Sequence, residues 1–376
     1  MKIFFIDQQS YHNLSIYDYN ILSRLNLPIH YFCSELYDYK TLPENILFSK
    51  VFKYSSKKGR IAKVLSYIFS MMKILLGGVK ERPEIYHFQW MRVFTLDYYV
   101  PYILKKIFDT KVIFTVHNIL PRKQKKNTVK HFTKIYELSD YLIVHTETTK
   151  KELIERFGVN PEKIIIMPHG LLEINVDELE YKKCINRYIN DFDVKNKLLI
   201  ALLGAQSYYK GTDLLVNAWK HSDTLSKNEN IVLLIAGKNN MKEKLDDLPN
   251  NVKVINRILS NEEFKALIHI SDLIALPYRE IDQSGFLLSI LNENAPYCCT
   301  NVGELIAPLK IADVGWNLGK PEEKTIGKNL ELIVSNPAEI YSKKKNLEGW
   351  KKIHSLFGWD TSALVLKSLY QKIVSQ

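Results

Sequence analysis

The sequence lacks several features that mark common classes of protein. No GxGxxG run follows its first strand-like segment, KIFFI, so a dinucleotide site is not expected in that half. Its four cysteines form no CxxC pair or other metal spacing, so we expect them to be reduced and structural. No uninterrupted apolar run is long enough to span a membrane, and no signal peptide is evident. These absences predict a cytoplasmic chain.

Length and charge add two expectations. The chain has 376 residues, of which 46% are hydrophobic, enough to bury two cores. Residues 1–176 hold 26 Lys and Arg against 16 Asp and Glu, whereas the rest of the chain holds 26 against 25. We therefore expect the first half to meet an anionic membrane surface, a phosphorylated acceptor or nucleic acid. A lysine-rich solvated surface is the alternative.

Apolar segments of strand length alternate with segments of helix length, which predicts an α/β fold. The expected strands are 2–7, 28–33, 50–54, 85–90, 111–121, 141–145, 163–167, 198–203, 231–236, 252–255, 273–276 and 296–300. The pattern weakens and charge rises over 171–196, which predicts a domain boundary. We expect two Rossmann-like parallel-sheet domains facing across a cleft. They are predicted to cover 1–175, joined by a C-terminal helix at about 355–376, and 190–354.

The stretch from Ser271 to Glu293 predicts a strand, a polar loop and the start of a helix. In an open parallel sheet such a junction binds ligands, because the helix presents unpaired N–H groups to an anion. Ser284 is a candidate helix cap and Gly285 lets a phosphate approach the backbone. Glu280 and Asp282 offer acceptors for sugar hydroxyls. The alternative is an ordinary turn between a strand and a helix.

A second cluster opens the second half of the chain. Gly204 follows a predicted strand, and Lys210 stands just before a predicted helix. A lysine ammonium over a glycine-permitted loop suits a diphosphate, whereas a plain surface lysine is the alternative. Gly237 and Lys238 end the next strand in the same way.

The first half carries a polar pair, His117 and Asn118, at the end of an apolar strand, a position that belongs in a binding cleft. A hydrogen-bonded turn histidine is the alternative. A basic run follows, formed by Arg122, Lys123, Lys125, Lys126 and Lys130.

Residues 57–76 predict an amphipathic helix with cations crowded at its N-terminal end. The apolar face is expected to comprise Ile61, Val64, Leu65, Ile68, Phe69, Met72, Leu75 and Leu76. Because cations at a helix N-terminus oppose the helix dipole, an external anion explains them better than helix stability does. The face is expected either to cover the core or to lie in a membrane interface.

Five motifs now point to a known group. They are TVHNILP at 115–121, YKGTDLL at 209–215, LLIAGK at 233–238, LPYREIDQSG at 276–285 and NVGE at 301–304. In this order the chain resembles GT-B glycosyltransferases of family GT4, particularly those that make bacterial surface polysaccharides such as O-antigen or capsule. The resemblance spans nearly the whole chain.

The resemblance implies a nucleotide-sugar donor held mainly by the second domain, no metal or other cofactor, and retention of the anomeric configuration. Lys210 matches the lysine that contacts the donor diphosphate, and His117 matches the histidine beside the transferred sugar. Glu280 or Asp282 matches the acidic sugar contact. The implied donor-binding set is Gly204, Lys210, Gly237, Lys238, Ser284, Gly285, Phe286 and Glu293.

Two departures from the family pattern stand out. Family members often carry Arg just after the glycine that matches Gly204, whereas this chain continues with Ala205, Gln206 and Ser207. The usual pair of glutamates is replaced by Asp282 and Ile290, with Glu293 as a candidate substitute for the ribose contact.

The function expected from these observations is sugar transfer to a lipid-diphosphate-linked glycan by a protein peripheral to the inner face of the cell membrane. A catalytically silent GT-B protein that assists an active transferase is the main alternative. Nucleic-acid binding is disfavoured because the tyrosines follow no stacking pattern. A metal-dependent GT-A enzyme is disfavoured because the DxD at 191–193 lies in the predicted boundary. A sugar-nucleotide epimerase is a minor alternative.

Overall fold

The computed structural model describes residues 1–11, 14–53, 56–91, 97–108, 110–121, 124, 126–193, 195–241, 245–281 and 283–375. The chain divides into two compact units, and each is described by itself. The first unit comprises Met1–Gly170 and Phe357–Gln376, and the second comprises Leu171–Leu356.

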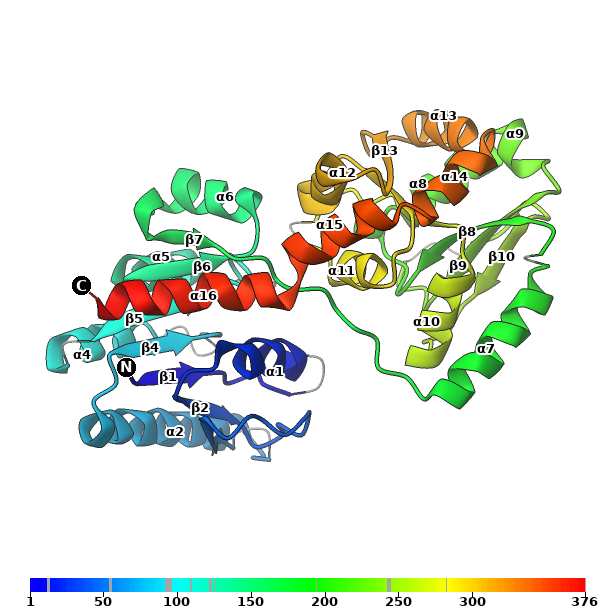
Figure 1. Ribbon diagram of the computed structural model, residues 1–376. Coiled ribbons are helices and arrows are strands. Elements are labelled where there is room, and N and C mark those ends of the chain that lie inside the picture. Colours follow the sequence, from blue (N-terminus) through cyan, green and yellow to red (C-terminus); the bar gives the residue numbers. More distant parts are fainter. Residues whose placement is uncertain are drawn as a thin grey trace. The chain divides into compact units, whose positions relative to one another are not determined.

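The first unit is a seven-stranded parallel sheet in the order β3-β2-β1-β4-β5-β6-β7 (Figure 1). Its strands are β1 (Ile3–Ile6), β2 (Ile29–Ser34), β3 (Ile46–Phe52), β4 (Ile85–Phe88), β5 (Lys111–Thr115), β6 (Tyr141–Val144) and β7 (Ile164–Ile166). Its helices are α1 (Leu14–Leu25), α2 (Arg60–Glu81), α4 (Tyr99–Ile107), α5 (Thr128–Leu138), α6 (Glu147–Phe157) and α16 (Trp359–Val374). Most of these strands are buried on both faces, as parallel sheets require.

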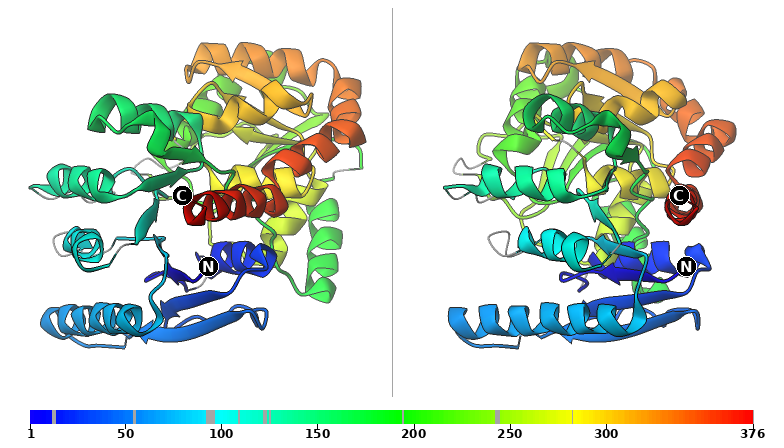
Figure 2. Two further views of the ribbon diagram at one scale, coloured as in Figure 1. Left: turned by 60° about the vertical axis from the view of Figure 1, so that its left-hand side comes forward. Right: turned by 90° about the vertical axis from the view of Figure 1, so that its left-hand side faces the viewer.

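Helices cover both faces of this sheet. On one face α1 and α16 pack side by side, while α4, α5 and α6 lie on the other (Figure 2). The buried phenol of Tyr370, on α16, lies 2.5 Å from Nδ1 of His87 on β4, so the C-terminal helix is tied to the middle of the sheet.

Helix α2 covers the sheet with a different stripe from the predicted one. Its buried apolar residues are Tyr67, Met71 and Ile74, which pack into the core with the aromatic side chains of β1 and β3. Of the eight residues expected on the apolar face, Val64 and Leu75 are partly buried and the other six are exposed. The expectation that this face covers the core is therefore wrong, because the helix carries two apolar stripes and the sheet buries the other one.

The second unit is a six-stranded parallel sheet in the order β10-β9-β8-β11-β12-β13. Its strands are β8 (Leu198–Leu203), β9 (Ile231–Ala236), β10 (Val252–Ile255), β11 (Leu273–Leu276), β12 (Tyr297–Thr300) and β13 (Gly315–Gly319). Its helices are α7 (Glu178–Asp191), α8 (Thr212–Lys220), α9 (Asp223–Ser226), α10 (Asn261–Ile270), α11 (Gly285–Asn292), α12 (Ala307–Ile311), α13 (Glu323–Val334), α14 (Pro337–Lys344) and α15 (Leu347–Phe357). The two parallel-sheet domains predicted from the sequence are confirmed.

The region 171–196, predicted as a boundary, contains helix α7. Asp177 caps it, accepting a hydrogen bond from the Glu180 N–H at 2.9 Å. The helix packs on α10, where the Tyr188 hydroxyl donates to Glu263 at 2.8 Å. The stretch is polar because α7 buries only a narrow stripe of its own surface, Cys184 and Tyr188, against the second unit.

Candidate functional site

The strand order of the second sheet reverses between β8 and β11. From β8 the chain passes to β9 on one side, and from β11 it passes to β12 on the other. The loops that follow β8 and β11 therefore open side by side at the switch point, where parallel sheets bind ligands. These loops and the first residues of α11 contain five of the eight residues predicted for the donor.

In the loop after β8, the side-chain amine of Lys210 lies close to the backbone of Gly204, which has no side chain. Gly204 has φ +94°, and a Cβ added there would lie 2.9 Å from the Lys210 Nζ. The same nitrogen lies 5.8 Å from the ring centroid of Tyr278. Burial lowers the pKa of Lys210 to about 8, since its charged form is poorly solvated. An anion that approaches Gly204 thus meets an ammonium group whose charge it would stabilise.

The two loops are joined by close backbone contacts. A Cβ on Gly211 would lie 1.9 Å from the Pro277 carbonyl oxygen, so glycine is required where the loops cross. The Arg279 N–H donates to the Tyr209 carbonyl at 2.8 Å. The two predicted clusters therefore lie together in the structure.

Arg279 holds the two loops together, and no role was predicted for it from the sequence. Its guanidinium donates to the Tyr208 carbonyl at 2.6 Å and to both Asp213 carboxylate oxygens at 2.7 and 2.5 Å. It also stacks over the Tyr208 ring at 3.8 Å. A two-pronged pair of this kind fixes geometry as well as charge. The signal in the sequence was an arginine in the loop after β11, close to the glycine and serine already singled out.

Helix α11 presents its N-terminus at the same junction. Buried Ser284 caps it by accepting a hydrogen bond from the Leu287 N–H at 3.2 Å. Within the described part of the chain, the N–H groups of Gly285 and Phe286 have no acceptor, and Gly285 is exposed. Such open amides at the positive end of a helix dipole favour an anion.

The remaining predicted residues are placed as follows. Gly237 packs so closely that an added Cβ would lie 2.0 Å from the Gly204 carbonyl oxygen. Lys238 has an exposed side chain at the end of β9, and its carbonyl accepts from the Gln206 N–H at 2.9 Å. Glu280 is exposed on the loop after β11. Asp282 lies outside the described residues.

The structure shows where the residues that depart from the family pattern lie. Gln206, which is 1% exposed, turns its amide inward, donating to the Gly204 carbonyl at 2.7 Å and accepting from the Thr212 hydroxyl at 2.8 Å. Ile290 is fully buried in α11. Glu293 stands at the C-terminal end of α11, where its carboxylate lies 3.6 Å from Lys265 Nζ of α10. Glu293 is therefore at the end of the helix away from the open amides.

The first sheet carries a different cluster at its carboxyl ends. His117, His145 and His169 follow the neighbouring strands β5, β6 and β7, and their rings lie 5.0 to 6.4 Å apart. Tyr17 of α1 contacts all three rings edge-on, with centroid distances of 4.8 to 5.6 Å. The sequence predicts a role for His117 but not for the cluster, because the convergence of three strand-ending histidines depends on the order of the strands in the sheet.

His117 is held as a neutral imidazole. Burial, helped by the neighbouring histidines, sets its pKa well below the usual value. Its Nε2 lies 3.1 Å from Gln89 Oε1, and the Trp90 ring stacks on it at 4.6 Å. Together with Gln9 and Trp90 it lines a pocket of about 290 Å³. Among the described residues no group of histidine, cysteine or carboxylate side chains is arranged to hold a metal ion.

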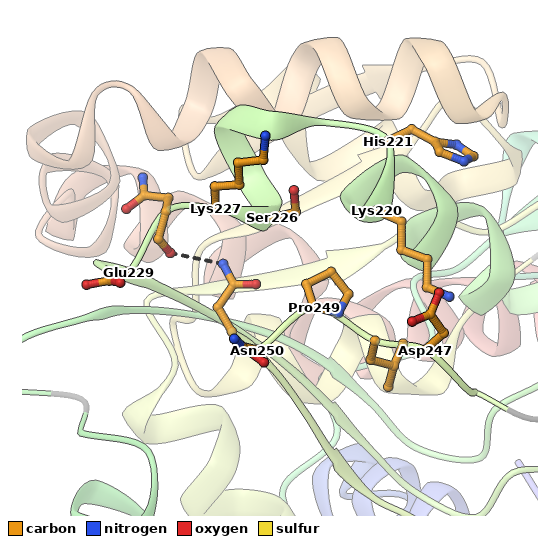
Figure 3. A pocket seen from close by; sticks show the side chains of 11 residues that line it. Lys220, His221, Ser226, Lys227, Glu229, Asp247, Pro249 and Asn250 are labelled. Carbon is orange, nitrogen blue, oxygen red and sulfur yellow. Dashed lines mark hydrogen bonds between the residues drawn. The ribbon is translucent and has the colours of Figure 1, made fainter.

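A larger open pocket of about 730 Å³ lies near the amino ends of β9 and β10 (Figure 3). Lys220, Lys227 and Asn250 contribute to its lining, and the Lys220 ammonium donates to the Asp246 carbonyl at 2.7 Å. None of the predicted donor residues lines it. Because ligands of parallel sheets bind at the carboxyl ends of the strands, size alone does not make this pocket the site.

Each half of the chain matches a model of a known protein family. Residues 22–171 match the model of Glycosyltransferase Family 4, and residues 186–295 match the model of Glycosyl transferases group 1. A relative, an uncharacterized glycosyltransferase of Methanocaldococcus jannaschii, is 25% identical over 231 residues. That match covers 56% of this chain and 55% of the relative.

Solved structures match over almost the whole length. Sucrose-phosphate synthase from Thermosynechococcus elongatus is 13% identical with a TM-score of 0.72, over 100% of this chain and 99% of the other. Anabaena HepE in complex with UDP-glucose is 11% identical with a TM-score of 0.65, over 99% and 100% of the two chains. At these identities the likeness shows the fold. With both halves matched in this order, the chain is a glycosyltransferase with a GT-B fold, built from a Family 4 domain followed by a group 1 domain.

Proposed function

We propose that this protein transfers a sugar from a nucleotide-sugar donor and that the second unit holds the donor diphosphate. The observation that carries the proposal is the junction of two loops at the switch point of the second sheet. There the Lys210 amine lies over Gly204, and the open amides of Gly285 and Phe286 begin a helix. Cation, bare backbone and helix N-terminus are the three elements that bind phosphate without a metal.

The chemistry assigned to these groups is stabilisation of the leaving diphosphate. As the bond from the anomeric carbon to the diphosphate oxygen breaks, negative charge grows on that oxygen. Lys210 and the two amides are fixed in place before the reaction, so they stabilise this charge with little reorganisation. Arg279 and Gln206 hold the loop that carries the lysine. We propose that transfer retains the anomeric configuration and that His117, in the first unit, acts on the sugar.

The acceptor proposed here is a lipid-diphosphate-linked glycan on the inner face of the cell membrane, as in surface polysaccharide assembly. Supporting this, the net positive charge of the chain is concentrated in residues 1–176. HepE was solved with UDP-glucose, which supports a nucleotide sugar as the class of donor.

A donor screen tests the proposal. The full chain is incubated with a panel of UDP-, GDP-, ADP- and dTDP-sugars and a polyprenyl-diphosphate-sugar acceptor, and the products are detected by mass spectrometry. The expected result is addition of one sugar mass from one class of donor, and the anomeric proton coupling of the product reports retention. If calorimetry also detects no nucleotide sugar bound at millimolar concentration, the catalytically silent alternative replaces the proposal.

A further inference from the structure

Helix α2 turns a continuous apolar stripe away from the first unit. Seven large apolar side chains on this helix are between 37% and 78% exposed: Ile61, Leu65, Ile68, Phe69, Met72, Leu76 and Val79. At 100° per residue they fall within one side of the helix, opposite the buried stripe. With 22 residues the helix is about 33 Å long, so the stripe is a large apolar surface for a folded domain.

The buried stripe fixes the helix to the unit. The Tyr67 hydroxyl accepts from the Gln8 amide at 2.6 Å and donates to the Asp97 carboxylate at 2.5 Å. The Ser70 hydroxyl donates to the Val51 carbonyl at 2.7 Å. By length and composition α2 is the one helix in the described part of the chain that could cross a membrane. Because these hydrogen bonds hold α2 along the sheet domain, a membrane could contact the helix only along its length.

The charge along α2 is almost entirely positive, and Glu81 at its C-terminal end, paired with His30, is the one acidic residue of the helix. Residues 56–80 contain six cations and no acidic residue. The cations are Lys57, Lys58, Arg60, Lys63, Lys73 and Lys80, and in the described part of the chain none of them forms an ion pair. The Lys73 ammonium lies over the Phe69 ring at 5.0 Å, at the border between the apolar stripe and the cations.

The apolar surface continues toward α4. Val79 and Ile107, which is 66% exposed, line the same pocket between the C-terminal ends of the two helices. Tyr102 of α4 is 46% exposed, with the Lys106 ammonium over its ring at 5.3 Å. Apolar side chains bordered by tyrosine and lysine are typical of surfaces that lie at a lipid interface.

We propose that the outward face of α2 lies in the interface of a membrane rich in anionic lipids. This rests on the membrane location proposed above and names the surface responsible. A second copy of the chain is disfavoured as the occupant, because it would bring two unpaired groups of cations together. An anionic bilayer instead receives the apolar side chains among its acyl chains and the cations among its head groups.

Vesicle sedimentation tests this proposal without any donor or acceptor. Wild-type protein is expected to sediment with vesicles of equal parts phosphatidylcholine and phosphatidylglycerol, and much less with phosphatidylcholine alone. The double variant Leu65→Gln, Leu76→Gln is expected to bind the mixed vesicles at least about tenfold more weakly. Its matched control is Leu332→Gln, Leu347→Gln, since these two leucines are 62% and 78% exposed on helices of the second unit. The control is expected to bind as wild type does.

Replacing Lys57, Lys58, Arg60 and Lys63 with Gln is expected to weaken binding to the mixed vesicles by about fivefold per charge at low salt. Failure of wild-type protein to bind the mixed vesicles would overturn the proposal, as would equal binding by the Leu65, Leu76 variant. So would a concentration-dependent dimer in analytical ultracentrifugation that the same variant abolishes, because the occupant would then be a second copy. Each result stands whether or not the chain transfers a sugar.

A second, independent observation concerns Gln89, which is 1% exposed at the end of β4. Its amide nitrogen donates to His87 Nε2 at 3.0 Å, so its carbonyl oxygen faces His117 Nε2 at 3.1 Å. His87 is in turn bonded to Tyr370 of α16. We infer that Gln89 is a positioning residue that places the proton of His117 on Nε2 and leaves the lone pair on Nδ1.

This inference rests on the role proposed for His117, because a neutral Nδ1 accepts a hydrogen bond from a sugar hydroxyl only in this tautomer. Nitrogen-15 NMR of labelled histidine reads the tautomer directly and needs no substrate. We expect the Nε2–H form in the wild type, and a mixture of the two forms with about tenfold lower kcat/KM in Gln89→Leu. An Nδ1–H form in the wild type, or an unchanged tautomer in the variant, would overturn it.

Discussion

The carboxyl ends of the two sheets differ in what they offer a ligand, although the two sheets are built alike. The second sheet offers a cation, glycine backbone and open helix amides. The first offers uncharged imidazole rings packed with Tyr17 and Trp90. The residues of the second sheet suit a diphosphate. The residues of the first sheet suit a sugar, whose hydroxyl groups need neutral acceptors and whose ring packs against flat apolar faces. Under the proposed function, one architecture divides the chemistry of sugar transfer between the residues placed after the strands of its two sheets.

The largest effect is expected from the cation of the second sheet. We expect Lys210→Ala to slow sugar transfer by about 100- to 1,000-fold, because the leaving diphosphate loses its nearest positive charge. Steady-state rates with the donor found in the screen measure the effect. Lys220→Ala is the control, since Lys220 lies near the amino ends of the strands and should leave the rate unchanged. A near wild-type rate for Lys210→Ala would remove the basis for this division.

His117→Ala tests the other half of the comparison, the role of the first unit. We expect a fall of about 100-fold in kcat, because a neutral acceptor beside the sugar is lost. The affinity for the free nucleoside diphosphate is expected to stay within about twofold of wild type, since that ligand is assigned to the second unit. Calorimetry with the diphosphate beside kinetics with the full donor separates the two quantities. A large loss of diphosphate affinity in this variant would mean that the two clusters share the ligand.

Gly204→Ala tests whether bare backbone is needed beneath the lysine. An added Cβ would lie 2.9 Å from the Lys210 amine, so the amine must move, and we expect about tenfold weaker diphosphate binding. Gly158→Ala is the matched control, because Gly158 also has a positive φ but nothing within 4 Å of its added Cβ. Both variants should lose about 1 kcal/mol of unfolding free energy through backbone strain, and only Gly204→Ala should lose affinity. Equal affinities would show that strain is the whole effect.

Near neutral pH the smallest effect is a pH dependence, of about twofold between pH 7 and pH 8. Burial lowers the pKa of Lys210 to about 8. Only the protonated amine attracts a diphosphate, so affinity should be level below about pH 7 and fall toward tenfold per pH unit above pH 8. Calorimetry between pH 6.5 and about 9.5 follows this change. Lys210→Arg should flatten the profile, because a guanidinium stays charged throughout the range.

The fold could be predicted from sequence because most strands are fully buried apolar runs between helix-length segments. The bounds expected for β8, β9, β10 and β11 match those in the structure. Strand β13 was missed because its sequence, GWNLG, has two glycines and only Leu318 is buried. The stripe of α2 that covers the sheet was misassigned for a different reason. Periodicity shows that a helix has apolar sides, but not which side the sheet covers.

The candidate site could be predicted only where a few residues close together in the sequence carry the signal. Gly204, Lys210 and Ser284 lie in two short loops after strands, and Gly285 begins the helix that follows the second loop. The two loops meet in the structure. Contacts between residues distant in sequence could not be predicted, because no local pattern indicates them. The pairing of Arg279 with Asp213 depends on the adjacency of β8 and β11. The histidine cluster likewise depends on the order of β5, β6 and β7.

Hydrogen–deuterium exchange of the full chain, with and without a saturating nucleoside diphosphate, addresses the placement of the diphosphate most directly. Backbone amides that bind a phosphate exchange more slowly. We predict slower exchange in peptides covering 204–211 and 284–288, and no change at the amino ends of β9 and β10. Protection confined to any other part of the chain, with these two segments unchanged, would contradict the assignment of the diphosphate to the second sheet.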